Sequence, residues 1–463
     1  MGRRKREKRA ARRRGRQRRG PTPAQRGFGG EPHGPGCACG GQDDWDDFVD
    51  PGASWSAPPP PAEVVVEALL TAAHAEAGGD TSAAAACAAE LAGGYFAREE
   101  RLLSTGAGLA LAQVITRLWR AGWLPGDVWE IARRRTDAAA SSLLIDTVAA
   151  DFARHAPATV HERWAAQVGQ LGAALWWDRE QPHLGQWVAR SGLSFHDGLF
   201  TAITLLAVLV ALPELPQLVP PPGTATRRAA SPAAGVDQRI LGRVRGLLAK
   251  AESTEYPEEA EALSAKAQEL MNRHAFERAL VDAEHHKQQS ATSTRLWLDS
   301  PYLEAKSHLV AAIADANRCK SVFYPKLEFV ALVGAEMDLE ITEVLATSLL
   351  VQAGRAMIAE GRHVGHSGSS RTRSFRQSFL VSYAVRIGER LAEAGARAHD
   401  PVDDARLLPV LADRSRVVEA AFREMFSHTV EKAVSVTNGA GWHAGRAAAD
   451  RADLTVDQHK VSA

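Results

Sequence analysis

The chain has 463 residues, of which 45% are apolar, and its 55 Lys and Arg are balanced by 55 Asp and Glu. This composition is enough to bury a large core, and the length predicts two or three domains. Four cysteines are too few for a disulfide framework. They therefore argue against a disulfide-built secreted domain and favour a reducing cytoplasm.

Charge is unevenly distributed along the chain. Residues 1–26 hold 13 Lys and Arg against one acid, Glu7, which leaves 42 basic and 54 acidic residues elsewhere. Basic side chains beside phosphates release counterions, so this tail could bind nucleic acid without sequence preference. A solubilising tail is the alternative. The candidate contacts in the tail are Arg3, Arg4, Arg12 and Arg13. No apolar stretch follows the arginine pairs, which argues against a secretory signal.

Residues 1–61 have a disordered composition, with an arginine run followed by Gly- and Pro-rich sequence. Cys37 and Cys39 lie within it and resemble the first half of a short zinc motif. The positions where a second pair of ligands is expected hold Phe48 and Val49. We therefore favour two free thiols, and we expect no metal or cofactor.

Residues 62–212 are Ala- and Leu-rich with helical periodicity and predict an all-helical domain of seven or eight helices. The expected breaks are near Gly78, Gly106, Pro125, Pro157 and Pro182. Seven of the eleven tryptophans lie between Trp119 and Trp187, where core positions are the expected role and a carbohydrate or peptide groove is the alternative. The apolar run Leu199–Leu212 is too short to span a membrane comfortably.

A linker is predicted at residues 213–236 from its Pro content, and a helical hairpin follows at 237–276. Apolar residues repeat along one face of its first helix from Ile240 to Ala251, and Pro257 suits the start of the second. Beside the first face runs a basic row that could track a phosphate backbone, although such rows usually form a solvated edge. The row consists of Arg239, Arg243 and Lys250.

The hairpin resembles domain-of-unknown-function family 2786. The shared pattern is carried by Val244–Ser253, Glu259–Ala262 and Lys266–His274, and Ser374–Ala394 resembles a second region found downstream in members. The resemblance implies a shared fold. It transfers no catalytic residue to this sequence.

Residues 296–455 predict a small α+β domain. A polar loop is expected at Ala283–Arg295, and a helix capped by Ser300 and Pro301 follows. A β-hairpin is expected around Pro325, then a long helix from Gly334 to Ile358 and another from Ser374. The remaining expected elements are a helix at Val417–Phe426, a strand at Thr429–Val436 and a helix at Gly441–Ala452. The predicted fold is mainly α, with an all-helical N-terminal domain, a helical hairpin, and then a helix–β-hairpin–helix region.

A basic loop before Ser374 is the second candidate for phosphate contact, with a plain solvated loop as the alternative. Its arginines are Arg362, Arg371 and Arg373, and His363 and His366 lie among them. Two further arginines, Arg376 and Arg390, project along the apolar stripe of the next helix. Each needs a carboxylate, a carbonyl oxygen or a ligand anion as partner, and an internal ion pair is the usual outcome. We expect an internal partner for Arg390 and a ligand for Arg376. The Gly439-x-Gly441-x-x-x-Gly445 run is a weak phosphate-cradle signal and reads better as a turn and helix start.

The sequence thus favours a cytoplasmic protein without catalytic activity that binds nucleic acid or an acidic partner and does not enter the membrane. One alternative is an enzyme of unknown class with an anion pocket. Its candidate residues are Arg376, Arg390, Tyr383, His274 and His443. Another is a protein–protein adaptor that uses the Trp-rich helical region. The sequence does not predict the oligomeric state.

Overall fold

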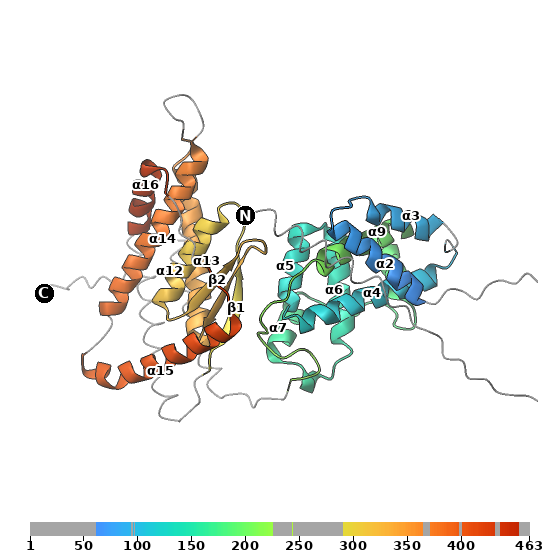
Figure 1. Ribbon diagram of the computed structural model, residues 1–463, viewed down its shortest axis with the longest axis horizontal. Helices are drawn as coiled ribbons and strands as arrows, with labels where there is room; N and C mark the ends of the chain where they lie inside the picture. The colour runs from blue at the N-terminus through green and yellow to red at the C-terminus, as the bar shows by residue number, and fades with distance from the viewer. Residues whose placement is uncertain are drawn as a thin grey trace, which may run out of the picture. The chain divides into compact units, whose positions relative to one another are not determined.

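The computed structural model describes residues 62–93, 96, 98–225, 243, 290–363, 371–397, 401–430 and 436–452. All of them belong to the compact unit Pro60–Ala463. The fold is mainly helical, with one small antiparallel sheet in the C-terminal half, as predicted (Figure 1). The tail, nearly all of the hairpin, and the Cys37 and Cys39 pair lie outside the described residues.

Eight α-helices occupy residues 62–212, in agreement with the predicted number. They are α2 (Ala62–Ala77), α3 (Ala83–Gly93), α4 (Glu100–Arg120), α5 (Pro125–Arg135), α6 (Ala138–Phe152), α7 (Glu162–Gln170), α8 (His183–Ser191) and α9 (Phe195–Val210). The predicted break at Gly106 is wrong, because this residue lies inside α4. A Cβ there would be 2.5 Å from the Val65 Cγ1, so the glycine allows α2 and α4 to approach closely.

The core of these helices is built from α9 and the tryptophans. Helix α9 contains most of the apolar run expected to be internal, and Leu199, Leu205 and Leu206 on it are fully buried. Trp123 and Trp164 are also buried, and their indole N–H groups donate to the carbonyl oxygens of Pro213 and Pro220 at 2.8 and 3.1 Å. Trp123 and Trp164 therefore pack the core and also fix the chain that follows α9.

The predicted linker, 213–236, is described as far as Ala225. In this part Leu215 and Val219 are buried, and Leu215 N–H donates to Ala121 O at 2.8 Å. Thr159 O accepts from the N–H groups of Gly223 and Ala225 at 3.0 and 3.1 Å. This stretch is thus packed along the helices. The division of the chain into separate domains on either side of residues 213–236 remains a prediction.

The sheet has three strands in the order β1-β3-β2, all antiparallel: β1 (Thr292–Trp297), β2 (Lys320–Tyr324) and β3 (Phe329–Gly334). The predicted hairpin is confirmed as β2 and β3, with a turn at residues 325–328. The predicted loop at Ala283–Arg295 is partly wrong, because its end forms β1, where Thr292 pairs with Gly334 and Trp297 with Phe329. This strand was not predicted because most of its residues are polar and the residues that they contact lie far away in the sequence.

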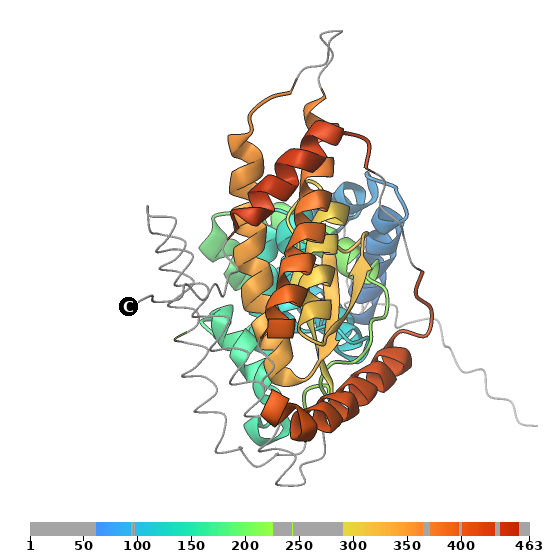
Figure 2. The ribbon, with the colours of Figure 1, turned by 90° about the vertical axis from the view of Figure 1, so that its left-hand side faces the viewer.

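The two faces of the sheet pack against different layers. Val330 and Leu332 face a cluster formed by α12 (Leu303–Ala316), α13 (Glu336–Ala359) and α14 (Thr372–Arg397), and α16 (Gly439–Asp450) lies against α14 (Figure 2). Phe329, Ala331 and Val333 belong to the cluster that contains the N-terminal helices and residues of α15 (Pro401–Met425). One apolar cluster therefore continues from the helical region to the sheet.

Several predicted boundaries need correction. The cap at Ser300 and Pro301 is wrong, because α12 begins at Leu303 after Tyr302, which has φ +69°. Helix α15 begins well before Val417. Thr429 and Val430 are not in a strand, and residues 431–435 lie outside the description. Of the described helices, α13 alone has the length and apolarity to cross a membrane by itself, and α8 with α9, bent by 111°, would qualify as a pair. Core helices satisfy the same criterion.

Candidate anion-binding site

The end of α13 and the start of α14 are held together by backbone and side-chain contacts. Arg371 N–H donates to His363 O at 3.0 Å, and His363 N–H donates to Thr372 Oγ1 at 3.1 Å. The His363 ring stacks on Phe375, with ring centroids 3.4 Å apart and planes 15° from parallel. These contacts bring Arg362 close to Arg371 and Arg373. Residues 364–370, which include His366, lie outside the description.

Four arginines at this junction are exposed, namely Arg355, Arg362, Arg371 and Arg373, and we call them the arginine cluster. Within the part of the chain that the structure describes, none of them forms an ion pair. Glu360 is an exposed acid nearby. The junction therefore carries several uncancelled positive charges, which suit a phosphate backbone or another polyanion.

Arg376 lies one turn into α14 and is partly buried. Its Nε is buried without a hydrogen-bond partner, and so is Nε2 of His363. An unmet buried donor costs roughly 1–3 kcal/mol, which an anion reaching it would offset. Arg376 is thus not fully exposed, and it forms no ion pair with an acid among the described residues, so its ligand-facing role remains a prediction.

Arg390, in contrast, has internal partners, but those described are backbone carbonyl oxygens, whereas an internal ion pair was expected. Its Nη1 donates to the carbonyl oxygens of Ala449 and Ala452 at the C-terminal end of α16. A cation at that end also interacts favourably with the helix dipole. Of the other residues in the enzyme alternative, Tyr383 is 1% exposed, His443 is exposed, and His274 lies outside the description. The described members therefore lie in different environments.

The glycine run before α16 is explained by helix packing. A Cβ on Gly441 would be 2.4 Å from Phe375 O, and one on Gly445 would be 2.2 Å from Phe379 O. The helix starts at Gly439, and Asn438 Oδ1 caps it by accepting from Gly441 N–H at 3.0 Å. The turn and helix start are thus confirmed. The glycines bring α16 into backbone contact with α14.

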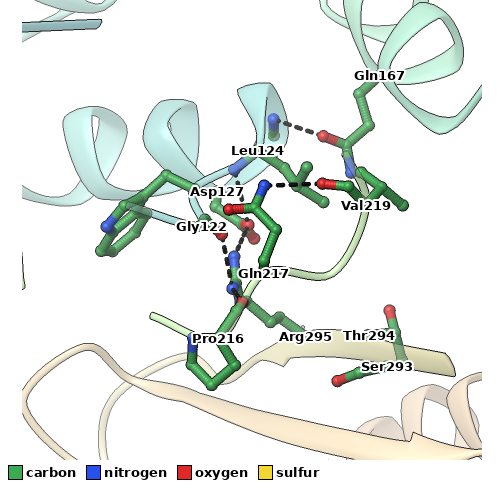
Figure 3. A network of polar contacts seen from close by, with 12 residues as sticks. Gly122, Leu124, Asp127, Gln167, Pro216, Gln217, Val219, Ser293, Thr294 and Arg295 are labelled. Atoms are coloured by element: carbon green, nitrogen blue, oxygen red, sulfur yellow. Dashed lines mark hydrogen bonds and ion pairs between the residues drawn. The ribbon is translucent and has the colours of Figure 1, made fainter. Parts of the chain in front are cut away.

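A buried polar network that was not predicted surrounds Arg295 on β1 (Figure 3). Arg295 Nη1 lies 2.5 Å from Asp127 Oδ2, with side chains 2% and 7% exposed. Arg295 Nη2 donates to Gly122 O at 2.8 Å and Pro216 O at 3.0 Å. Trp297 Nε1 donates to the other Asp127 oxygen at 3.2 Å. We call this network the Arg295 joint.

A second arginine, Arg163, is partly buried and continues the contact between the helices and β1. Arg163 donates to Ser293 O at 2.7 Å and to Thr294 Oγ1 at 2.9 Å, and Thr294 Oγ1 donates to Glu343 Oε1 at 2.6 Å. Burial lowers the pKa of the Arg163 guanidinium, and the negative charges of Asp127 and Glu343 partly offset this effect. These arginines are satisfied by protein groups, so their role is structural. Alternating Thr and Ser before Arg295 was the available sequence signal for β1.

The other predicted contacts fall outside this geometry. In the basic row of the hairpin, Arg243 is described only as helical and exposed, and Arg239 and Lys250 lie outside the described residues, as do Arg3, Arg4, Arg12 and Arg13. Cys87 and Cys319 are free thiols, and burial raises the pKa of Cys319 to about 12. No group of three or more metal-ligating side chains occurs within the described ranges.

Comparison with known proteins bears on one segment of the chain. Residues 239–278 match the model of the family described as Protein of unknown function (DUF2786), which confirms the resemblance over the hairpin, a small part of the chain. No curated protein and no solved structure matches the chain.

Proposed function

We propose that this protein binds nucleic acid through the phosphate backbone, without catalysis, in the cytoplasm. The observation that carries the proposal is the arginine cluster, whose members are exposed and form no ion pair with any carboxylate that the structure describes. The sequence supports it with a second basic region, because residues 1–26 hold 13 Lys and Arg against one acid. Both regions would contact phosphates, which position a protein on nucleic acid without reading its sequence.

Charge distribution favours a polyanion over a neutral partner. Outside residues 1–26 the chain has 42 basic and 54 acidic residues, so its body repels polyanions on average. Local positive regions on such a body restrict where a polyanion binds. Nucleic acid offers evenly spaced phosphates that both the cluster and the tail could contact together, and it is therefore preferred over an acidic protein.

The test is the salt dependence of binding to DNA and RNA oligonucleotides, measured by fluorescence anisotropy with the full chain. Each phosphate neutralised contributes about −0.9 to the slope of log K against log salt for duplex DNA, and about −0.7 for single strands. Deletion of residues 1–26 should remove most of the slope. The triple variant R362Q/R371Q/R373Q should reduce the rest by about 2 to 3.

A matched control separates the cluster from general charge. Arg98, Arg101 and Arg179 are also exposed and form no ion pair among the described residues, so R98Q/R101Q/R179Q removes the same charge elsewhere. In the control variant, the slope of log K against log salt should differ from that of the wild type by less than the contribution of one phosphate. A full chain that binds none of the oligonucleotides, or binds only an acidic protein probe, would refute the proposal.

A further inference from the structure

A hollow on the surface of the N-terminal helices is lined mainly by basic side chains, although this region of the chain is acidic overall. Its volume is about 480 Å³, and it lies along the second half of α4 beside residues that follow α6 and α9. The polar lining consists of Gln113, Thr116, Arg117, Arg120, Arg154 and Glu214. Three arginines thus face one carboxylate. Residues 62–225 as a whole contain 11 Arg, no Lys and 17 Asp and Glu, so the hollow reverses the local sign of charge.

Arg117 is held in place by neutral groups. Its Nη2 donates to Leu209 O at 3.0 Å and to Val210 O at 3.2 Å, at the C-terminal end of α9. Carbonyl oxygens orient the guanidinium and leave its formal charge uncancelled. The remaining N–H groups of this fork keep their capacity to donate to a ligand.

The other two arginines are weakly neutralised. Arg120 is exposed and forms no ion pair among the described residues, and Glu214 likewise forms none with any of the three. Arg154 Nη1 is 3.7 Å from Asp151 Oδ1, a long contact. Asp151 uses its other oxygen to accept from Trp119 Nε1 at 2.8 Å. The carboxylate is therefore shared, and Arg154 retains positive charge toward the hollow.

We propose that this hollow binds the phosphate group of a small phosphorylated ligand. Guanidinium forks match phosphate oxygens in geometry, and three of them suit a dianion better than a single carboxylate. Leu109, which is 42% exposed, and Ala112 form an apolar part of the wall, where the uncharged body of the ligand would lie. This site is separate from the arginine cluster and does not depend on the proposed nucleic-acid binding.

Pyrophosphate is the probe, and titration calorimetry and thermal unfolding are the measurements. The full chain carrying R362Q/R371Q/R373Q is the background, so that the arginine cluster does not contribute. In this background pyrophosphate should raise the Tm, and R120Q/R154Q should weaken its Kd at least tenfold. Arg101 is exposed on the same helix, outside the hollow, and R101Q should leave the Kd unchanged.

A parallel titration with a single-stranded oligonucleotide tests whether the hollow binds a small phosphorylated ligand or the phosphates of nucleic acid. Loss of pyrophosphate affinity in R120Q/R154Q, with oligonucleotide affinity retained, would support a small phosphorylated ligand. Loss of oligonucleotide affinity alone would assign the hollow to nucleic acid and overturn the proposal. Equal pyrophosphate affinity in all variants would overturn it too. Neither result depends on whether the arginine cluster binds nucleic acid.

Discussion

The Arg295 joint and the arginine cluster use the same side chain in opposite ways. Arg295 is buried, and it is satisfied by a carboxylate and two carbonyl oxygens. The four arginines of the cluster are exposed and form no ion pair among the described residues. Removing a partner should therefore damage the fold at the joint, whereas removing charge from the cluster should change only what the protein binds.

The largest expected effect is at the joint. Asp127→Asn would leave Arg295 buried without its counter-charge, and the free energy of unfolding should fall by about 3–5 kcal/mol. Urea denaturation would measure this loss. Asp413→Asn is the control, because Asp413 pairs with Arg416 at the surface, with side chains 57% and 79% exposed. There the loss should stay below about 1 kcal/mol. Similar losses in the two variants would contradict the assignment.

The contact between α14 and α16 should be the next most sensitive. Gly445→Ala would place a methyl group about 2 Å from backbone and side-chain oxygen atoms of α14. Overpacking of this kind should cost about 3 kcal/mol in thermal or urea unfolding. Gly439→Ala is the matched change on the same helix, since a Cβ there meets nothing within 4 Å. A tolerated Gly445→Ala would show that the two helices are farther apart than described.

Arg390 and Arg376 provide the comparison within a single helix. Arg390→Met would remove the donor to two carbonyl oxygens at the C-terminal end of α16, and the free energy of unfolding should fall by about 2 kcal/mol. Arg376→Met should change it by less than about 0.5 kcal/mol or increase it, because a buried Nε without a partner is removed. The same variant should also lose any rise in Tm caused by phosphate. A large loss of stability in Arg376→Met would assign it an internal partner.

The smallest effect on stability is expected at the cluster. R362Q/R371Q/R373Q should unfold within about 0.5 kcal/mol of the wild type, since exposed residues without partners contribute little. Its oligonucleotide binding should nevertheless become less dependent on salt. Calorimetry and anisotropy on the same preparation would test both statements. A destabilised triple variant would show that these arginines serve the fold.

Local patterns were sufficient to predict most of the helices and the β2–β3 hairpin. Apolar periodicity located α13 and α14, and the β-forming residues on either side of Pro325 located the hairpin. Strand β1 was missed because its stability comes from partners far along the chain: Arg295 pairs with Asp127, 168 positions away. The spacing of residues along the sequence does not indicate a contact between such distant positions. Gly106 was misread for a related reason, since its partner is Val65 on another helix.

The candidate site was predictable only in part. The basic character of the loop before Ser374 follows directly from its residues. The backbone contacts of His363 with Arg371 and Thr372, and the addition of Arg355 from the preceding helix, required the fold. The hollow beside α4 was not predicted, because Arg117, Arg120 and Arg154 come from two helices and their ends. Which arginines are structural and which can bind a ligand likewise depends on whether the fold places an acidic side chain beside them.

The packing of residues 213–225 has a consequence for how the family segment could be handled experimentally. Among the described residues on either side of this segment, Gly223 and Ala225 donate to Thr159 before it, and Ser293 and Thr294 accept from Arg163 after it. Thr159 and Arg163 are four positions apart. The points of departure and return thus lie beside each other on one short stretch of the protein. A short glycine–serine bridge in place of residues 226–289, or a relative's segment grafted between the same two points, would therefore have only a short distance to span.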